Sequence, residues 1–137
     1  MTRTGFLAPA LSGLFVLAGC GGEVVSAAGT TVLVGERSTS GMDALGGGTL
    51  EVVGGCLGAD GYVIVWPYGT AVVDEDPLTV DVPDLGRVVI GEEFRVGGGF
   101  VLDHSDATTP RSPGPYQAGG ITVPAECAAY DVFLASG

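Results

Sequence analysis

The only histidine of this chain lies among residues that could carry hydrolytic chemistry. His104 stands in the run Asp103-His104-Ser105-Asp106, which supplies a nucleophile type, a base and two acids. Neighbouring side chains in an extended run point in opposite directions, so this run by itself cannot bring the three groups together. We therefore expect His104 to be a loop residue hydrogen-bonded to a neighbouring carboxylate, and a catalytic role is the alternative.

Carboxylate pairs are the second candidate, because glycoside hydrolysis uses two of them around the scissile bond. The candidates are Asp74, Glu75, Asp76, Glu92 and Glu93. Such an enzyme needs a cleft that holds sugar rings, which a domain this small seldom provides. The chain has no lysine for a Schiff base, and cysteines joined in a disulfide cannot act as thiolates. We expect no enzymatic activity and no cofactor; a small hydrolase that uses carboxylates or His104 is the alternative.

The acidic turn at 74–76 is also a candidate cation site. A helix-flanked calcium loop needs oxygen ligands at alternate positions followed by a glycine. The chain supplies Asp74 and Asp76 but continues with Leu78 and Thr79, so it does not fit that pattern. A looser site made of the two aspartates and nearby carbonyls is the alternative to a solvated turn.

Two aromatic residues flank Pro67 at the end of a strand-like run. Trp66 and Tyr68 are candidates for a platform on which a sugar or a proline-rich peptide stacks. The sole tryptophan of a small domain more often fills its core. Tyr68 is therefore the stronger candidate for ligand binding.

The first cysteine follows an apolar segment near the N-terminus. Residues 1–4 carry one positive charge, and residues 6–18 carry none. This pattern is typical of a secretory signal, and the apolar stretch is too short to span a bilayer core of about 30 Å. The run Leu17-Ala18-Gly19-Cys20 resembles the lipobox of bacterial lipoproteins.

This resemblance implies that residues 1–19 are a cleaved signal peptide. It also implies that Cys20 becomes the N-terminus and carries diacylglycerol on its sulfur, with acyl chains such as palmitate. Two acyl chains suffice to anchor a protein to a membrane, here the extracytoplasmic face of the cell membrane. An ordinary cleaved signal with an incidental cysteine nearby is the alternative.

Counting cysteines gives a partly independent expectation. If lipid modifies Cys20, then Cys56 and Cys127 remain, and two cysteines in an exported domain usually form a disulfide. The bond would close a loop of about 70 residues and restrict the unfolded chain by about 4 kcal/mol. It would also pin the last strand-like run beside the first. Without lipidation, one thiol is left over.

The charge balance restricts the partners. Sixteen Asp and Glu stand against five arginines, which gives a net charge of −11. Nucleic acid and anionic lipid surfaces attract basic patches, so we expect neither as a partner. The expected partners are the membrane, through the lipid anchor, and an envelope protein or a glycan.

Short β-type runs separated by Gly, Pro and Asp predict an all-β domain over residues 48–137. The runs cover 49–53, 62–66, 70–73, 78–82, 87–90, 93–96, 100–102 and 130–135. The run Tyr62 to Trp66 is apolar on both faces, which indicates a central strand, whereas Leu78 to Val82 has one polar face. We expect a small Greek-key or OB-like open barrel, or a sandwich, with one disulfide.

The remaining segments have weaker patterns. Residues 20–47 are small and polar and are followed by Gly48, which predicts a flexible tether, although 30–34 has strand composition and allows an extra edge strand. Gly97-Gly98-Gly99 is expected to break the sheet or form a bulge. The segment Asp103 to Gly120 is expected to be one long loop, either a working surface or filler, and 124–130 is a weak helix candidate.

The domain also resembles short lipoproteins of actinobacteria. The shared segments are Gly55-Cys56-Leu57, Val65 to Gly69, Gly91 to Gly99 and Pro124 to Cys127. This resemblance implies no particular activity. The sequence therefore predicts a membrane-anchored extracytoplasmic lipoprotein whose β domain binds a ligand or organises the envelope without covalent chemistry. An envelope hydrolase and a cation-binding module are the alternatives.

Overall fold

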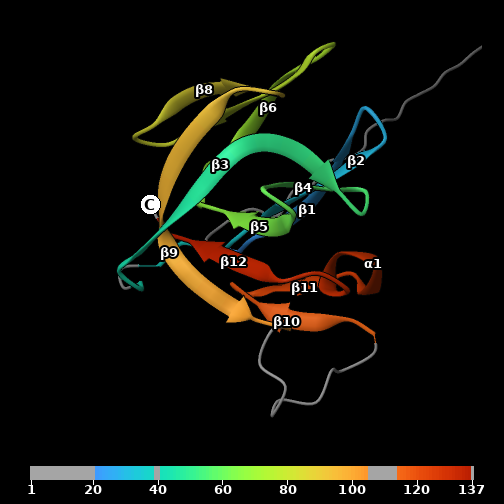
Figure 1. Ribbon diagram of the computed structural model, residues 1–137, viewed down its shortest axis with the longest axis vertical. Helices are drawn as coiled ribbons and strands as arrows, with labels where there is room; N and C mark the ends of the chain where they lie inside the picture. Colours follow the sequence, from blue (N-terminus) through green and yellow to red (C-terminus); the bar gives the residue numbers. More distant parts are fainter. Residues whose placement is uncertain (1–20, 39–40, 105–113, 137) are drawn as a thin grey trace, which may run out of the picture.

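The computed structural model describes residues 21–38, 41–104 and 114–136, and within them the chain folds almost entirely into β-strands (Figure 1). The elements are β1 (Glu23–Ala27), β2 (Thr30–Val34), β3 (Ala44–Val53), β4 (Cys56–Ala59), β5 (Tyr62–Trp66), β6 (Ala71–Glu75), β7 (Leu78–Val82), β8 (Gly86–Val89), β9 (Glu93–Leu102), β10 (Tyr116–Ala118), β11 (Ile121–Val123), α1 (Ala125–Ala128) and β12 (Val132–Ala135). The predicted all-β class is confirmed. The helical turn α1 falls inside the segment 124–130 that the sequence marked as helical.

A large curled sheet organises the molecule. Its seven strands follow the order β1-β2-β4-β3-β9-β12-β5, and β5 also pairs with β2 and β4, so the sheet turns back on itself. A three-stranded sheet, β6-β7-β8, and a hairpin, β10-β11, complete a sandwich-like arrangement. Most neighbours are antiparallel, but β5 runs parallel to both β12 and β2.

Two hydrophobic cores lie on opposite faces of β5. Ile64 and Trp66 point into the core shared with the three-stranded sheet, whereas Val63 and Val65 point into the core beneath β10, β11 and α1. All four side chains are fully buried. The prediction that 62–66 is a central strand, apolar on both faces, is confirmed because period-2 alternation places apolar residues in both cores.

The prediction of a flexible tether over residues 20–47 is wrong for most of that range. β1 and β2 form an antiparallel hairpin, and β2 continues into the sheet beside β4 and β5. Val32, Leu33 and Val34 are buried, so β2 is an interior strand and not the extra edge strand that its composition allowed. The polar surroundings concealed it, because burial of a short strand depends on partners far away in the sequence.

Glycines 46–48, interpreted as the end of the tether, also belong to the sheet. They lie within β3, opposite Phe94 to Val96 of β9, and are buried. A Cβ at position 46 would stand 2.5 Å from Cζ of Phe133, so the missing side chain makes room for that ring. Gly97 to Gly99 do not break the sheet either. β9 continues through them, and the register of β12 against β9 shifts between Val132 and Phe133, next to the glycines.

The disulfide between Cys56 and Cys127 is confirmed, with a Cα–Cα distance of 5.8 Å. It joins the start of β4 to α1, which immediately precedes the last strand. The prediction of one loop from Asp103 to Gly120 is corrected at its end, because Tyr116 to Ala118 form β10 and pair with β11. A three-residue strand without alternating apolar side chains leaves almost no signal in the sequence.

Candidate functional site

His104 is held by the segment that follows α1. Its backbone N–H donates to Oδ1 of Asp131 at 2.7 Å, and Nε2 of its ring lies 2.9 Å from the carbonyl oxygen of Ala128. A carbonyl oxygen only accepts, so Nε2 carries a hydrogen and donates it. The expected carboxylate thus binds the backbone of His104, while the ring binds a carbonyl. Ser105 and Asp106 lie outside the described residues.

Three of the carboxylates considered as catalytic or cation-binding groups accept hydrogen bonds from backbone N–H groups. Oε1 of Glu75 accepts from the N–H of Ala28 at 3.0 Å, and Oδ1 of Asp74 accepts from the N–H of Asp76 at 3.2 Å. Oε1 of Glu92 accepts from the N–H of Val89 at 2.9 Å. Within residues 21–38, 41–104 and 114–136, no group of three or more His, Cys, Asp or Glu side chains is arranged to hold a metal ion. Asp74, Glu75 and Asp76 are exposed, and the bond between Asp76 and Asp74 caps their turn.

Trp66 belongs to the core. Its side chain is fully buried, its ring packs against Phe94 with centroids 5.3 Å apart, and Nε1 donates to the carbonyl oxygen of Leu57 at 3.3 Å. The side chain of Trp66 therefore fills the core, the position that the sequence favoured for a sole tryptophan, and does not form an exposed platform beside Tyr68. Trp66 still contributes to the floor of a surface pocket.

That pocket is produced by the topology of the sheet. Because β2, β5 and β12 run parallel, with Val34 opposite Trp66 and Leu134 opposite Val65, their carboxyl ends meet at one edge. The segments that follow these three strands gather there. They are joined by the β7–β8 turn at Pro83 and by the β10–β11 turn at Gly119. The resulting pocket has a volume of about 390 Å³, within the range of about 300–1,000 Å³ typical of small-molecule sites.

The pocket combines an aromatic ring, a cation and two carboxylates. The guanidinium carbon of Arg37 lies 4.5 Å above the centroid of the Tyr68 ring, a cation–π geometry. Glu36 and Asp84 add hydrogen-bond acceptors, and Met42 and Leu134 add apolar surface. The predicted site residue Tyr68 is thus placed in a pocket, half-buried, with its ring covered on one side by Arg37.

Most of these partners of Tyr68 could not be predicted from the sequence. Arg37, Glu36 and Met42 fall in the segment interpreted as a tether, and Asp84 falls in a turn. The parallel pairing of β2 with β5 brings Glu36 and Arg37 to Tyr68, and the β7–β8 turn adds Asp84. Contacts between segments so distant in the chain leave no local pattern. The run Gly35-Glu36-Arg37, with one of the few cations directly after a strand, was the one available clue.

Cys20, the predicted lipidation site, lies outside the described residues, as do Leu17 to Gly19. In the portion of the chain that the structure describes, no helix has the length and apolar character needed to cross a bilayer.

No protein-family model, curated protein or solved structure matches this chain. The functional proposal therefore rests on the pocket and on the lipobox-like run.

Proposed function

We propose that this protein is a lipoprotein, held on the extracytoplasmic face of the cell membrane by lipid on Cys20, whose β domain binds a neutral sugar. The observation that carries the binding proposal is the pocket in which Arg37 covers one side of the Tyr68 ring and to whose lining Glu36 and Asp84 also belong. The run Leu17-Ala18-Gly19-Cys20 supports the anchor.

A sugar suits this set of side chains because it has both an apolar face and many hydroxyl groups. The Tyr68 ring offers a flat apolar surface to the C–H face of a pyranose. Hydroxyl groups donate as well as accept, so they complement both the guanidinium of Arg37 and the carboxylates of Glu36 and Asp84. The volume of about 390 Å³ suits a mono- or disaccharide.

The mixed charge disfavours ionic ligands. An anion placed on Arg37 would also face Glu36 and Asp84, and a cation placed on the carboxylates would face Arg37. An uncharged ligand avoids both repulsions.

Binding without bond cleavage is favoured by the exposure of the acids. The general acid of a glycosidase is set apart by burial in apolar surroundings. Glu36 and Asp84 are both exposed to solvent. His104, with its ring donating to Ala128, does not line the pocket.

The binding proposal can be tested through Trp66, the only tryptophan of the chain, because it lies in the pocket floor. Titration with neutral disaccharides is expected to change its fluorescence in a saturable way. Tyr68→Ala should weaken binding about tenfold, in line with the loss of a stacking contact. Tyr130→Ala, a matched change at an exposed tyrosine outside the pocket, should leave the affinity unchanged.

Two outcomes would reject sugar binding. One is a flat titration with every disaccharide, and the other is a saturable response to a proline-rich peptide in place of sugars. Chromatography of the recovered disaccharide should show it intact, whereas hydrolysis products would favour the hydrolase.

The anchor has its own test in fractionated cells. The wild-type protein is expected in the membrane fraction, and Cys20→Ala should move it to the soluble fraction because the acyl chains supply the attachment. A Cys20→Ala protein that stays in the membrane fraction would contradict the anchor.

A further inference from the structure

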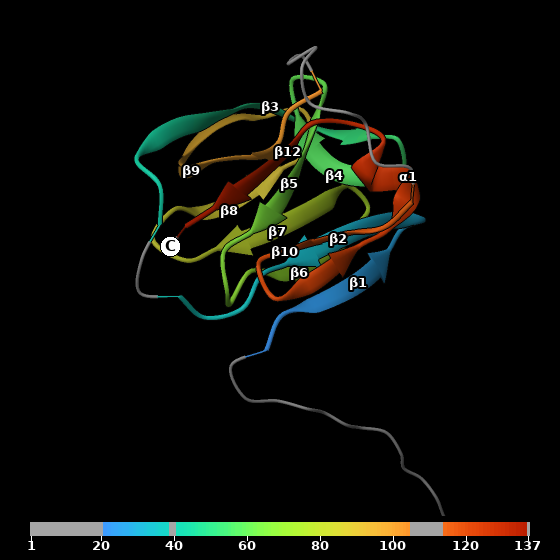
Figure 2. The ribbon, with the colours of Figure 1, turned by 90° about the horizontal axis from the view of Figure 1, so that it is seen from below.

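The start of β1 and the pocket occupy the same edge of the molecule. β1 is antiparallel to β2, so Glu23 pairs with Val34, the residue before the pocket wall begins at Gly35. A Cβ on Gly22 would approach the carbonyl carbon of Gly35 to 3.0 Å. Figure 2 shows the start of β1 and the segment after β2 side by side at the bottom of the view.

Very little chain separates this edge from Cys20. Three residue steps of about 3.8 Å place the Cα atom of Cys20 at most about 11 Å from that of Glu23. The head-group layer of a bilayer leaflet is itself about 5–8 Å thick. With β1 ordered from Glu23, a lipid on Cys20 would therefore hold the pocket edge close to the head groups.

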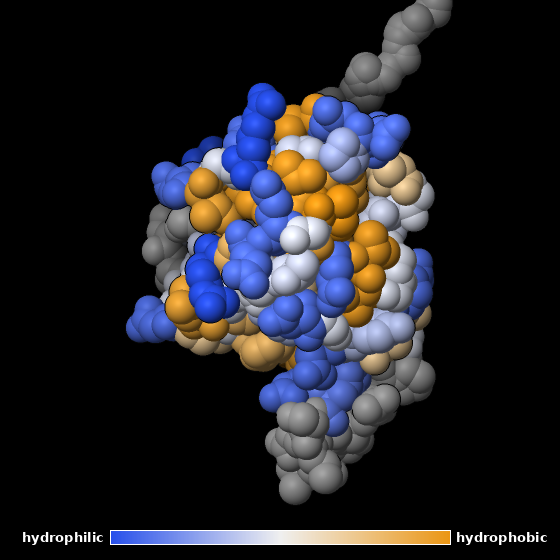
Figure 3. Space-filling model, turned by 45° about the horizontal axis from the view of Figure 1, so that its top comes forward, coloured by the Kyte–Doolittle hydropathy of each residue, from blue (hydrophilic) through white to orange (hydrophobic). Residues whose placement is uncertain are grey.

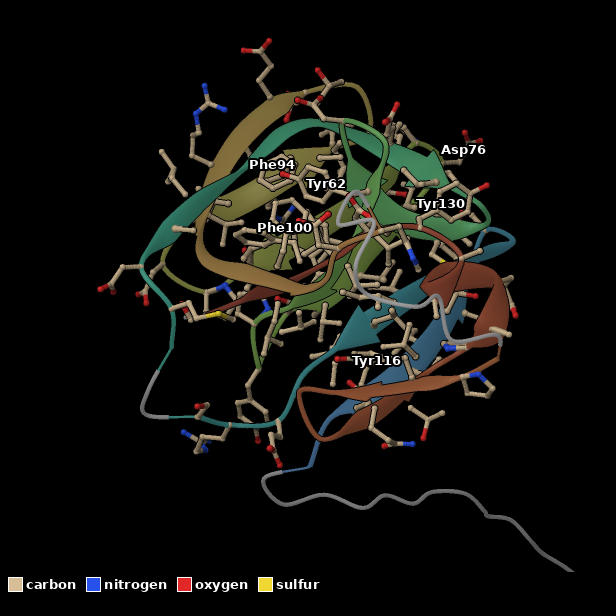
Figure 4. All side chains as sticks on the ribbon, turned by 60° about the horizontal axis from the view of Figure 1, so that its bottom comes forward. Tyr62, Asp76, Phe94, Phe100, Tyr116 and Tyr130 are labelled. Carbon is tan, nitrogen blue, oxygen red and sulfur yellow. A yellow bond between two sulfur atoms is a disulfide. The ribbon has the colours of Figure 1, made fainter. Side chains whose placement is uncertain are left out.

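The most acidic turn lies at the other end. β1 spans about 13 Å from Glu23 to Ala27, and the N–H of Ala28 beyond it binds Glu75. Figure 4 shows Asp76 and Tyr130 on the side of the molecule remote from the start of β1. The turn Asp74 to Asp76 is thus directed away from the membrane under this attachment.

The charges at the pocket edge determine which lipid head groups can approach it. Glu23, Glu36 and Asp84 stand there with Arg37, so acidic groups are in excess. Anionic phospholipid head groups would be repelled at this short range, which is comparable to the Debye length of about 8 Å. An uncharged sugar head group would not be repelled.

From this placement we infer that the pocket opens toward the anchoring membrane and binds the neutral sugar head group of a glycolipid in the same leaflet. This inference rests on the proposed lipidation of Cys20 and on the proposed sugar pocket. Confinement of both partners to one surface raises the effective sugar concentration to the millimolar range, which makes a weak single-sugar contact sufficient.

Orientation is tested first, with the full-length lipidated protein in phosphatidylcholine vesicles. A spin label is attached to Glu23→Cys or, as the control at the opposite end, to Asp76→Cys. Cys56 and Cys127 are buried in their disulfide, and the sulfur of Cys20 carries the lipid in this preparation, so the label reacts with the introduced cysteine. The label at position 23 should be relaxed strongly by a nickel chelate lipid in the head-group layer and the label at 76 weakly. Equal relaxation, or the reverse order, would overturn the orientation.

Ligand class is tested with the same lipidated protein through Trp66 fluorescence. Vesicles that contain digalactosyldiacylglycerol should change the emission, and soluble digalactose at the same bulk concentration should need at least tenfold more sugar for the same change. Tyr68→Ala should raise the glycolipid concentration needed for the same response about tenfold, and Tyr130→Ala should not affect it.

The outcomes separate this inference from the proposed function. A soluble sugar that acts as well as the glycolipid would overturn the membrane ligand and leave sugar binding standing. An equal response to phosphatidylglycerol vesicles would overturn the neutral head group. If neither the glycolipid nor soluble digalactose changed the Trp66 emission, both the glycolipid inference and the proposed sugar binding would be rejected.

Discussion

At the scale of single residues, glycines in β3 make room for large aromatic side chains in the core. Gly46 leaves space for the Phe133 ring, which in turn packs against Tyr62 and Phe100 with centroids 5.9 and 5.2 Å away. The hydroxyl of Tyr62 accepts from the N–H of Gly47 and donates to its carbonyl oxygen, both at 2.7 Å. The glycine run of β3 is therefore fitted to an aromatic cluster, although its composition is typical of a flexible linker.

Gly46→Ala is expected to lower the free energy of unfolding by about 1–3 kcal/mol, because the new methyl group would overlap a ring that has no room to retreat. Urea denaturation measures the change. Gly97→Ala is the matched control in the facing strand β9, since the nearest atom to its Cβ would be 3.8 Å away. Equal stability of the two variants would contradict the proposed fit.

At the scale of elements, the N-terminal hairpin is the largest departure from what the sequence predicted. β1 pairs with one edge of β2, and the other edge pairs with Cys56 of β4 and Val65 of β5, both more than 20 residues later in the chain. The sequence of β2 allowed a strand, but nothing local could show that the strand is interior. The strand runs 62–66 and 78–82 were predictable because each carries its own alternation, and the disulfide was predictable from the cysteine count.

Leu33→Ala is expected to cost about 2–5 kcal/mol of unfolding free energy, the usual range for emptying a buried leucine site. Val24→Ala, on the exposed side of the same hairpin, should change it by less than about 0.5 kcal/mol. Thermal or urea unfolding compares the two. A Leu33→Ala protein as stable as the wild type would contradict the interior position of β2 and would favour the flexible tether predicted from the sequence.

The disulfide links elements that are 71 residues apart in the chain. By the chain-entropy argument, reduction should lower the free energy of unfolding by about 4 kcal/mol. Urea unfolding of the oxidised and reduced forms gives this difference directly. Indistinguishable midpoints would show that the bond does not constrain the unfolded chain as expected.

At the scale of the whole molecule, the many acidic side chains also stabilise the fold. Carboxylates distributed over the surface accept hydrogen bonds from backbone N–H groups in turns, as Glu51 does from Gly61 and Asp60 does from Thr49. On the face that carries the three-stranded sheet, hydrophilic residues alternate with apolar patches (Figure 3). The same acidity disfavours anionic surfaces, so the proposed membrane attachment would depend on acyl chains and not on charge.

The candidate site could be predicted only in part at this scale. Tyr68 could be predicted as a binding residue because an aromatic side chain that follows a proline at the end of a strand is seldom needed in the core. Its partners Arg37 and Asp84 were not, because Arg37 reaches it through the parallel pairing of β2 with β5 and Asp84 through the position of the β7–β8 turn. The pairing of β1 with β2, which brings Glu23 beside the residue that precedes the pocket wall, was likewise not evident from the sequence.

Mass spectrometry of the protein purified from cell envelopes tests the central claim most directly. The lipoprotein account predicts an N-terminal peptide that begins at Cys20 and carries the mass of diacylglycerol on its sulfur. An unmodified Cys20, or a chain that retains residues 1–19, would contradict it.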